Sequence, residues 1–239
     1  RGAYPNVALR NGAAHAMAIA DIWEPNLQWH VFKVRHSPRY EAWDYVFRRL
    51  FYTCTPDILR EDFCAPIEVD NVDGTAGGLT NCDLWVAPEG ATHLLYTRRN
   101  IGSALMRDAY WPGEPLVAGL HHAVVREAEV VQRRTLMRCV EGKQQRSPGV
   151  ARFHVDPRGT LHVVCSASDP ALGGAKVLSV LELDSSFQPA GDWTDVGAKE
   201  AVARFSNSGE RVGAPRSDMV DLLGMGKDGR SVRYVRFAA

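Results

Sequence analysis

Short runs of alternating hydrophobic and polar residues, separated by turns that contain glycine, make up most of the chain. The runs are rich in Val, Leu, Trp, Tyr and Thr, which are residues that favour strands. No segment keeps the roughly 3.6-residue apolar period of an amphipathic helix; residues 45–50 come nearest, and that stretch is short. The pattern therefore predicts an all-β protein.

Four segments share one template of strand, tight turn and strand. They are residues 20–32, 82–96, 152–165 and 220–234. The last three turns contain Gly90, Gly159 and Gly229, at intervals of 69 and 70 residues, and glycine supplies the positive φ that hairpin turns need. Further strand-like runs, such as 121–126 and 176–183, follow the hairpins. Each module therefore holds about four strands.

Repeated four-stranded modules are typical of a β-propeller. We expect residues 1–239 to form a single β-propeller domain of four-stranded antiparallel blades, with about four to five blades visible. The run at residues 4–10 is expected to close the ring by adding a strand to the last blade. The alternative is that the chain, which begins at Arg1, is a segment of a larger propeller.

The charges of the chain are balanced, with 28 Lys and Arg against 28 Asp and Glu. This balance argues against nucleic acid or an anionic membrane as a partner, because such binders usually carry a basic excess. No apolar run approaches the roughly 18 residues that cross a bilayer. The cellular location of the protein stays open, and a secreted or periplasmic location is favoured.

The five cysteines form no CxxC motif. Cys54 and Cys64 can pair across a loop, but spacing alone does not establish a bridge. Cys82 and Cys165 lie inside strand-like runs, where they are expected to serve as buried small hydrophobic residues. No HExxH pair or phosphate-binding loop is present, so no cofactor is predicted, and a metal ion held between blades stays open.

The hairpins carry a Pro-x-Gly turn followed by histidine and two aliphatic residues, as in 88–95 and 157–164. This pattern resembles the BNR/sialidase-like propeller superfamily, which includes sialidases and propeller polysaccharide lyases such as those that act on ulvan. The resemblance implies a carbohydrate-active or carbohydrate-binding role. His30, His93 and His162 recur at one position of the second strand and are expected to be structural, because a catalytic group is normally needed only once.

Strand starts and hairpin turns lie at opposite ends of an antiparallel blade, so a site is expected at the face away from the Pro-x-Gly turns. His15, Asn81 and Arg216 precede the expected first strands, and Arg99 follows a second strand. His122 begins a third strand, behind an aromatic loop. We expect at least three of these five residues to line one concave surface, with Tyr110 or Trp111 at its rim.

The leading hypothesis is a lyase that cleaves an acidic, uronate-containing polysaccharide or oligosaccharide by β-elimination. The expected catalytic residues are His122, His15 and Tyr110, because imidazole and phenol groups can abstract and return protons. The expected substrate-binding residues are Arg99, Arg216, Asn81, Trp111 and Arg152. Arginine suits the uronate carboxylate, since its guanidinium can donate two parallel hydrogen bonds.

Two other functions remain open at this point. A non-catalytic carbohydrate-binding or scaffold propeller fits the neutral charge equally well. A glycoside hydrolase needs two carboxylates, and only Asp169 and Asp108 stand out as candidates near the expected face.

Overall fold

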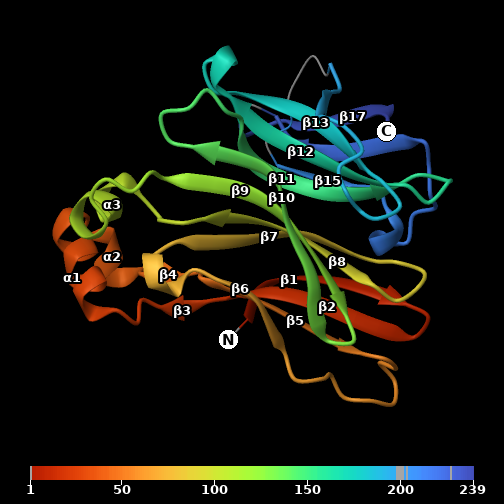
Figure 1. Cartoon of the computed structure of the whole chain (residues 1–239), viewed down its shortest axis with the longest axis horizontal. Helices are drawn as coiled ribbons and strands as arrows, with labels where there is room; N and C mark the ends of the chain where they lie inside the picture. The colour runs from red at the N-terminus through yellow and green to blue at the C-terminus, as the bar shows by residue number, and fades with distance from the viewer. Residues whose placement is uncertain (1, 198–201, 203, 227) are drawn as a thin grey trace.

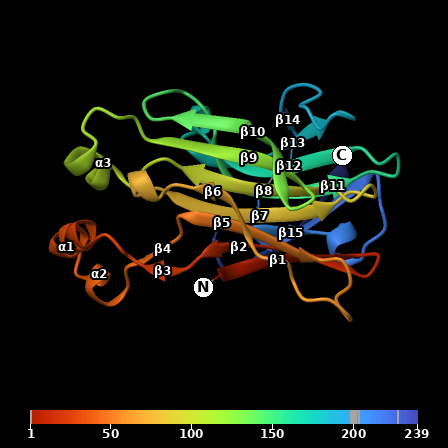
Figure 2. The same ribbon diagram turned by 60° about the horizontal axis from the view of Figure 1, so that its bottom comes forward.

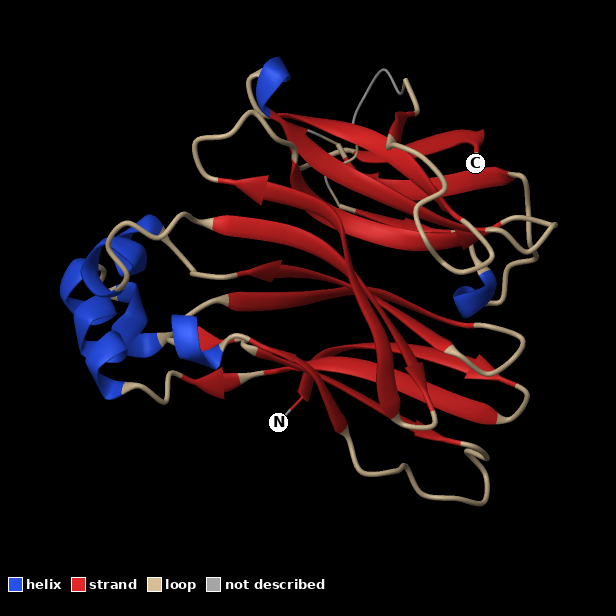
Figure 3. Cartoon of the chain, viewed as in Figure 1, coloured by secondary structure: helices blue, strands red, loops and turns tan. Residues whose placement is uncertain are grey.

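The computed structural model describes residues 2–197, 202, 204–226 and 228–239. Most of the described residues lie in antiparallel strands, and the three α-helices gather at one end of the molecule (Figure 1, Figure 3). None of the described helices is long and apolar enough to cross a membrane.

The first sheet has the strand order β1-β2-β5-β6. Its strands are β1 (Gly2–Arg10), β2 (Ala13–Ala20), β5 (Arg49–Thr55) and β6 (Ile67–Asn71). Asn11 and Gly12 form the turn between β1 and β2, and both have positive φ, as a two-residue hairpin turn requires. An insert interrupts the sheet between β2 and β5. It contains β3 (Ile22–Trp23), α1 (Leu27–His36), α2 (Arg39–Ala42) and β4 (Tyr45–Val46).

The second and third sheets are complete four-stranded meanders. The second contains β7 (Gly78–Val86), β8 (Thr92–Arg99), β9 (Val117–Arg126) and β10 (Glu129–Val140), with η1 (Asp73–Thr75) before it and α3 (Ala104–Tyr110) between β8 and β9. The third contains β11 (Ser147–Val155), β12 (Leu161–Asp169), β13 (Ala175–Leu183) and β14 (Thr194–Asp195), with η2 (Pro170–Leu172) after β12. The predicted hairpins at 82–96 and 152–165 are thus confirmed.

The fourth sheet has the order β15-β16-β17 in the part of the chain that the structure describes. Its strands are β15 (Phe205–Asn207), β16 (Met219–Met225) and β17 (Val232–Ala238), and η3 (Glu210–Val212) follows β15. The strands β1, β7, β11 and β15 start their sheets, and β7 contacts β1 and β11 while β15 contacts β11. This radial repetition of sheets is a β-propeller with four blades among the described residues, as predicted from the sequence.

The hydrophobic core lies between successive blades. Met17 and Leu50 of the first blade pack in one cluster with Leu84 of the second blade. Equivalent clusters lie between the second and third blades and between the third and fourth. The second and third sheets therefore bury both faces against neighbours, which explains why strands such as β8 and β12 are almost continuously buried.

Three expectations from the sequence are wrong in their details. Residues 27–36 form helix α1 and not a strand, because the Asn26 side chain caps its first turn by accepting from Trp29 N at 3.1 Å. Residues 4–10 lie in β1, the innermost strand of the first blade, and do not close the last blade. The hairpin at 220–234 joins the second and third strands of its blade, because β15 lies inside it.

Candidate functional site

The two ends of the propeller axis differ. Helices α1–α3 project beyond the strands at the end where β1, β7 and β11 start, and the hairpin turns lie at the other end (Figure 2). Helix η3 covers the axis at the turn end. There Trp85 Nε1 donates to Glu210 Oε2 at 2.6 Å, and Arg211 Nε donates to Asp83 Oδ1 at 2.6 Å. We call this set of contacts the axial plug.

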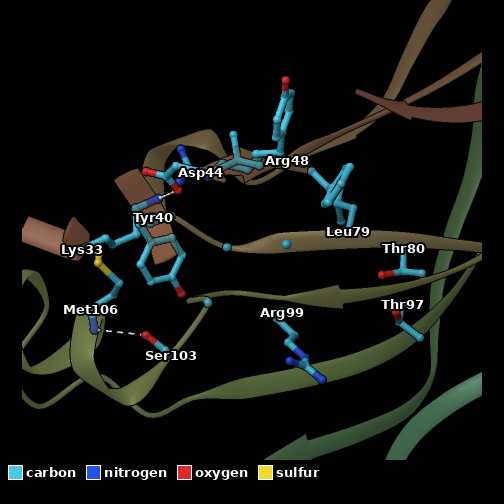
Figure 4. Close-up of a pocket in the computed structure, with 17 residues that line it drawn as sticks. Lys33, Tyr40, Asp44, Arg48, Leu79, Thr80, Thr97, Arg99, Ser103 and Met106 are labelled. Carbon is cyan, nitrogen blue, oxygen red and sulfur yellow. Dashed lines mark hydrogen bonds and ion pairs between the residues drawn. The ribbon is translucent and has the colours of Figure 1, made fainter. Parts of the chain in front are cut away.

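Two adjoining hollows lie at the end where the first strands begin. The helix pocket has a volume of about 370 Å³ and is walled by the insert, α3 and the ends of β7 and β8. The axis pocket has a volume of about 520 Å³ and is lined by Tyr4, Asn6, Asn81, Arg152 and Arg204. Phe47 and Thr80 belong to the walls of both hollows, so they form one double pocket. Figure 4 shows Tyr40 entering the helix pocket from the insert and Arg99 from β8.

The start of β7 approaches the end of β8 through Gly77. A Cβ atom at this position would lie 2.3 Å from Arg99 O and 2.6 Å from Asn100 O. No side chain fits between these carbonyl groups, so glycine is needed to hold the two strands at this separation. Gly77 thereby sets the backbone position of Arg99.

A buried ionic network lies behind the helix pocket. Lys33 Nζ donates to Glu24 Oε2 at 2.8 Å and to Asp44, and Arg48 Nη1 donates to Glu24 Oε1 at 2.9 Å. His30 Nδ1 bonds the other Asp44 oxygen at 2.8 Å. Burial opposes ionisation of Glu24, but the donors Arg48 and Lys33 outweigh it and hold the pKa of Glu24 below its ordinary value. The network fixes the insert through paired charges.

Tyr110 and Trp111 help to dock the insert and do not stand at an open rim. Both rings contact Trp29 of α1, at centroid distances of 6.2 and 5.4 Å, and Phe32 lies 5.3 Å from Tyr110. The Tyr110 hydroxyl donates to Gln28 O at 3.2 Å. Tyr40 and Tyr45 of the insert line the helix pocket instead.

Three arginines line the double pocket and form no ion pair with a carboxylate among the described residues, although the charge of Arg152 also acts on buried Asp83. Arg99 is exposed at the end of β8, and Arg204 is exposed before β15. Arg152 donates through Nη1 to the main-chain oxygens of Cys82 and Ala151, while its buried Nε has no partner. The double pocket therefore concentrates positive charge in a chain whose formal net charge is zero.

The two histidines expected to act in catalysis are buried between strands. His15 Nδ1 lies 2.7 Å from the Tyr52 hydroxyl and 3.1 Å from Thr92 Oγ1, and burial lowers its pKa. His122 is fully buried, with Nε2 lying 2.9 Å from His93 Nδ1, and burial lowers the pKa of His122 to about 4. Neither ring lines the double pocket.

The remaining expected residues divide between the two ends of the axis. Asn81 lies in the axis pocket, where its amide donates to Tyr4 O and, at 2.5 Å, to Asn6 Oδ1. Arg216 lies at the turn end, beside Gly159, and its Nε donates to Glu210 Oε1 at 2.8 Å. Of His15, Asn81, Arg99, His122 and Arg216, only Asn81 and Arg99 reach the double pocket. The expected convergence of at least three of them on one concave surface is therefore wrong.

The misplacements of His15 and Arg216 have one physical cause. His15 was assigned to the start of a first strand, but it lies in β2, whose start is at the turn end. Arg216 precedes β16, which is also a second strand. A shift of one strand reverses the end at which a residue lies, because neighbouring strands run in opposite directions.

The carboxylates around the double pocket do not form a pair suited to glycoside hydrolysis. Asp44 is the only acidic side chain that the described lining residues supply, and it bonds Lys33 and His30. Asp169 caps η2 and pairs with Arg146 at 2.8 Å, and Asp108 pairs with Arg107. No group suited to hold a metal ion occurs in the described part of the chain.

Comparisons with known proteins support the fold. No family model and no curated protein matches the chain. A Hadza microbial sialidase matches 98% of this chain with a TM-score of 0.56 and 11% sequence identity. An α-L-arabinanase from Penicillium chrysogenum, solved with arabinobiose, also matches 98% of this chain, with a TM-score of 0.53 and 10% sequence identity. A protein of unknown function from Dyadobacter fermentans matches 98% of this chain with a TM-score of 0.59 and 9% sequence identity.

The chain spans only part of each of these proteins, namely 43%, 56% and 60% of their respective lengths. Identities this low support the shared fold alone. The sialidase match agrees at that level with the resemblance drawn from the Pro-x-Gly hairpins.

Proposed function

We propose that this propeller binds an acidic, uronate-containing oligosaccharide in the double pocket. The observation that carries the proposal is the cluster of Arg99, Arg152 and Arg204 around two adjoining hollows, where none of the three forms an ion pair with a carboxylate among the described residues. Arginines elsewhere, such as Arg146, are paired with carboxylates. An anionic ligand would supply the missing counter-charge.

The other lining groups suit a saccharide. Thr80, Thr97 and Ser103 offer hydroxyl groups, and Tyr40 and Tyr45 offer flat rings at the wall of the helix pocket. Hydroxyl groups can donate to and accept from sugar hydroxyls, and aromatic rings present apolar faces with a polar handle. The names of the sialidase and the arabinanase, which share this fold, point to the same class of ligand.

Binding without catalysis is favoured over β-elimination. The two imidazoles expected to act as bases are buried and line neither hollow, and the lowered pKa of His122, about 4, makes it a weaker base than an ordinary histidine. Tyr110 donates its hydroxyl to a main-chain oxygen of α1. The lining residues that the structure describes thus offer no histidine base to a bound uronate.

Glycoside hydrolysis is the second candidate. The names of three similar structures, a sialidase, an arabinanase and a β-xylosidase with a TM-score of 0.52, favour it. Most glycoside hydrolases, sialidases excepted, use two carboxylates roughly 5–9.5 Å apart, whereas Asp44 is the sole acid in the described lining. Release of reducing ends from uronate oligosaccharides, without formation of an unsaturated uronate, would establish hydrolysis in place of simple binding or β-elimination.

Calorimetric titration with a uronate oligosaccharide tests the proposal. Arg99→Gln should weaken binding by roughly 10-fold or more, because a hydrogen bond to a charged group contributes about 1.5–3 kcal/mol. Arg138→Gln is the matched control, since Arg138 is exposed on β10 and lines neither hollow. Equal affinities for the two variants would contradict the proposal.

A further inference from the structure

Cys54 and Cys64 form a pair of thiols at the edge of the first blade. Cys54 lies in β5, and Cys64 lies in the loop that leads from β5 to β6. Their Sγ atoms are 3.7 Å apart. A disulfide has an S–S length of about 2.05 Å, so the two sulfurs need to approach by less than about 2 Å.

Main-chain contacts already hold the two cysteines against each other. Cys64 N donates to Cys54 O at 2.8 Å, and Cys54 N donates to Cys64 Sγ at 3.4 Å. Thr53 Oγ1 donates to Cys64 O at 2.6 Å and lies 3.6 Å from Cys64 Sγ. The backbone around the two thiols is therefore preorganised for a bond between them.

The two thiols differ in reactivity. Burial disfavours the Cys64 thiolate, but the hydrogen bond from Cys54 N and the nearby Thr53 hydroxyl outweigh it and lower the pKa of Cys64. Burial raises the pKa of Cys54. Since the thiolate is the nucleophile, Cys64 is suited to react first and Cys54 to resolve the product.

The other cysteines lack this arrangement. Cys82 and Cys165 are buried inside strands, and burial raises their pKa values to about 11 and about 12. Cys139 Sγ contacts Gln145 O at 3.6 Å. Disulfide formation should therefore be selective for Cys54 and Cys64, because these two thiols are partly exposed to solvent and their sulfur atoms lie close together.

We propose that Cys54 and Cys64 are a redox-active pair that forms a reversible intramolecular disulfide with a low-molecular-weight disulfide, such as oxidised glutathione, as the oxidant. The Cys64 thiolate attacks one sulfur of the oxidant and expels one glutathione thiolate, which leaves a mixed disulfide. Cys54 then loses its proton and attacks Cys64 Sγ, which expels the second glutathione. Two protein thiols are oxidised to one disulfide while one oxidised glutathione is reduced to two thiols.

The bond would join the loop after β5 to the body of the first blade. In that loop Ile58 N donates to Gly12 O at 3.0 Å, and Thr55 Oγ1 donates to Glu61 O at 2.9 Å. Leu59, at the loop surface, is 90% exposed. A covalent link restricts this loop in the unfolded chain as well as in the folded one, which is the main way a disulfide stabilises a protein.

The test is incubation of the folded full chain in glutathione buffers, followed by intact mass analysis and peptide mapping without reduction. The expected product has lost two hydrogen atoms, carries a link between positions 54 and 64, and retains no glutathione. Its melting temperature should exceed that of the reduced chain by roughly 5 °C. Cys139→Ser should give the same product and the same shift.

Single variants separate the two steps. Cys54→Ser should retain a mixed disulfide at Cys64, because the resolving thiol is gone, whereas Cys64→Ser should take up much less glutathione. A link between Cys82 and Cys165, or a folded chain that keeps both thiols free in oxidised glutathione, would overturn the proposal.

Discussion

The two ends of the propeller axis contain similar side chains but use them differently. At the turn end, Arg211 pairs with Asp83, and Arg10 and Arg216 pair with Glu210. At the opposite end, Arg99, Arg152 and Arg204 line the double pocket and form no ion pair in the described part of the chain. Paired charges close the axis at one end, whereas the arginines at the other end would bind the anionic saccharide that we propose. Equal totals of acidic and basic residues conceal this asymmetry.

The largest expected effect is on the axial plug. Asp83 is 3% exposed and accepts hydrogen bonds from Leu84 N, Phe153 N and Arg211 Nε. Asp83→Ala should lower the free energy of unfolding by about 3 kcal/mol or more, because it leaves buried donors unpaired. Thermal melting should show this as a drop of roughly 6–12 °C. Saccharide affinity of the folded fraction should not fall. A loss of saccharide binding at unchanged stability would contradict the difference in role between the two ends of the axis.

A smaller effect concerns pH and the histidines between blades. Burial lowers the pKa of His93 to about 2 and that of His122 to about 4. The unfolded chain therefore binds more protons than the folded chain below about pH 6.5, so stability should decrease as the pH falls from there to about 4. Urea unfolding at several pH values measures this.

His93→Gln supplies the matched comparison for the pH effect. The variant should be less stable at pH 7, since the His122 ring loses its partner at 2.9 Å, but should show a shallower dependence on pH. Its affinity for the saccharide should equal that of the parent. A change of affinity without a change of stability would place these histidines in the site and not in the framework.

The smallest effect is expected at the partly exposed contacts of the plug. Burial disfavours ionised Glu210, but donors Arg216 and Trp85 hold its pKa below the ordinary value. The resulting stabilisation is present above about pH 4.5 and is lost as the pH falls through the lowered pKa of Glu210 in the folded chain. Arg216→Gln should lower the free energy of unfolding by about 1 kcal/mol or less at pH 7 and leave saccharide affinity unchanged. A loss of saccharide affinity as large as that expected for Arg99→Gln would mean that Arg216 takes part in binding.

The sequence predicted where the hairpins lie better than which two strands of a blade each hairpin joins. Gly90 and Gly159 mark turns between first and second strands, whereas Gly229 lies between second and third strands. Glycine turns of both kinds use the same local chemistry, so a regular interval between them does not reveal which strand is innermost. Arg99 lies at the predicted end of the axis because its hairpin joins a first and a second strand, as expected, whereas Arg216 lies at the other end because it precedes a second strand.

Other features of the site depend on contacts between distant segments. His122 lies in a strand whose two faces both pack against neighbouring blades, so alternation along β9 did not show that it is buried. Residues 20–32 are predicted from the sequence as a hairpin, but most of them belong to the insert between β2 and β5. The ionic network of the insert and its packing on α3 make it a wall of the helix pocket. Arg204 joins the pocket only through the docking of the fourth blade.

The central claim is that unpaired arginines in the double pocket select an anionic saccharide. The most direct measurement compares the affinity of the chain for a uronate oligosaccharide with its affinity for the same oligosaccharide after its carboxyl groups have been reduced to alcohols. The account predicts that the acidic form binds at least roughly 10-fold more tightly and that added salt narrows the difference. Equal affinity of the two forms, or binding of the neutral form alone, would contradict it.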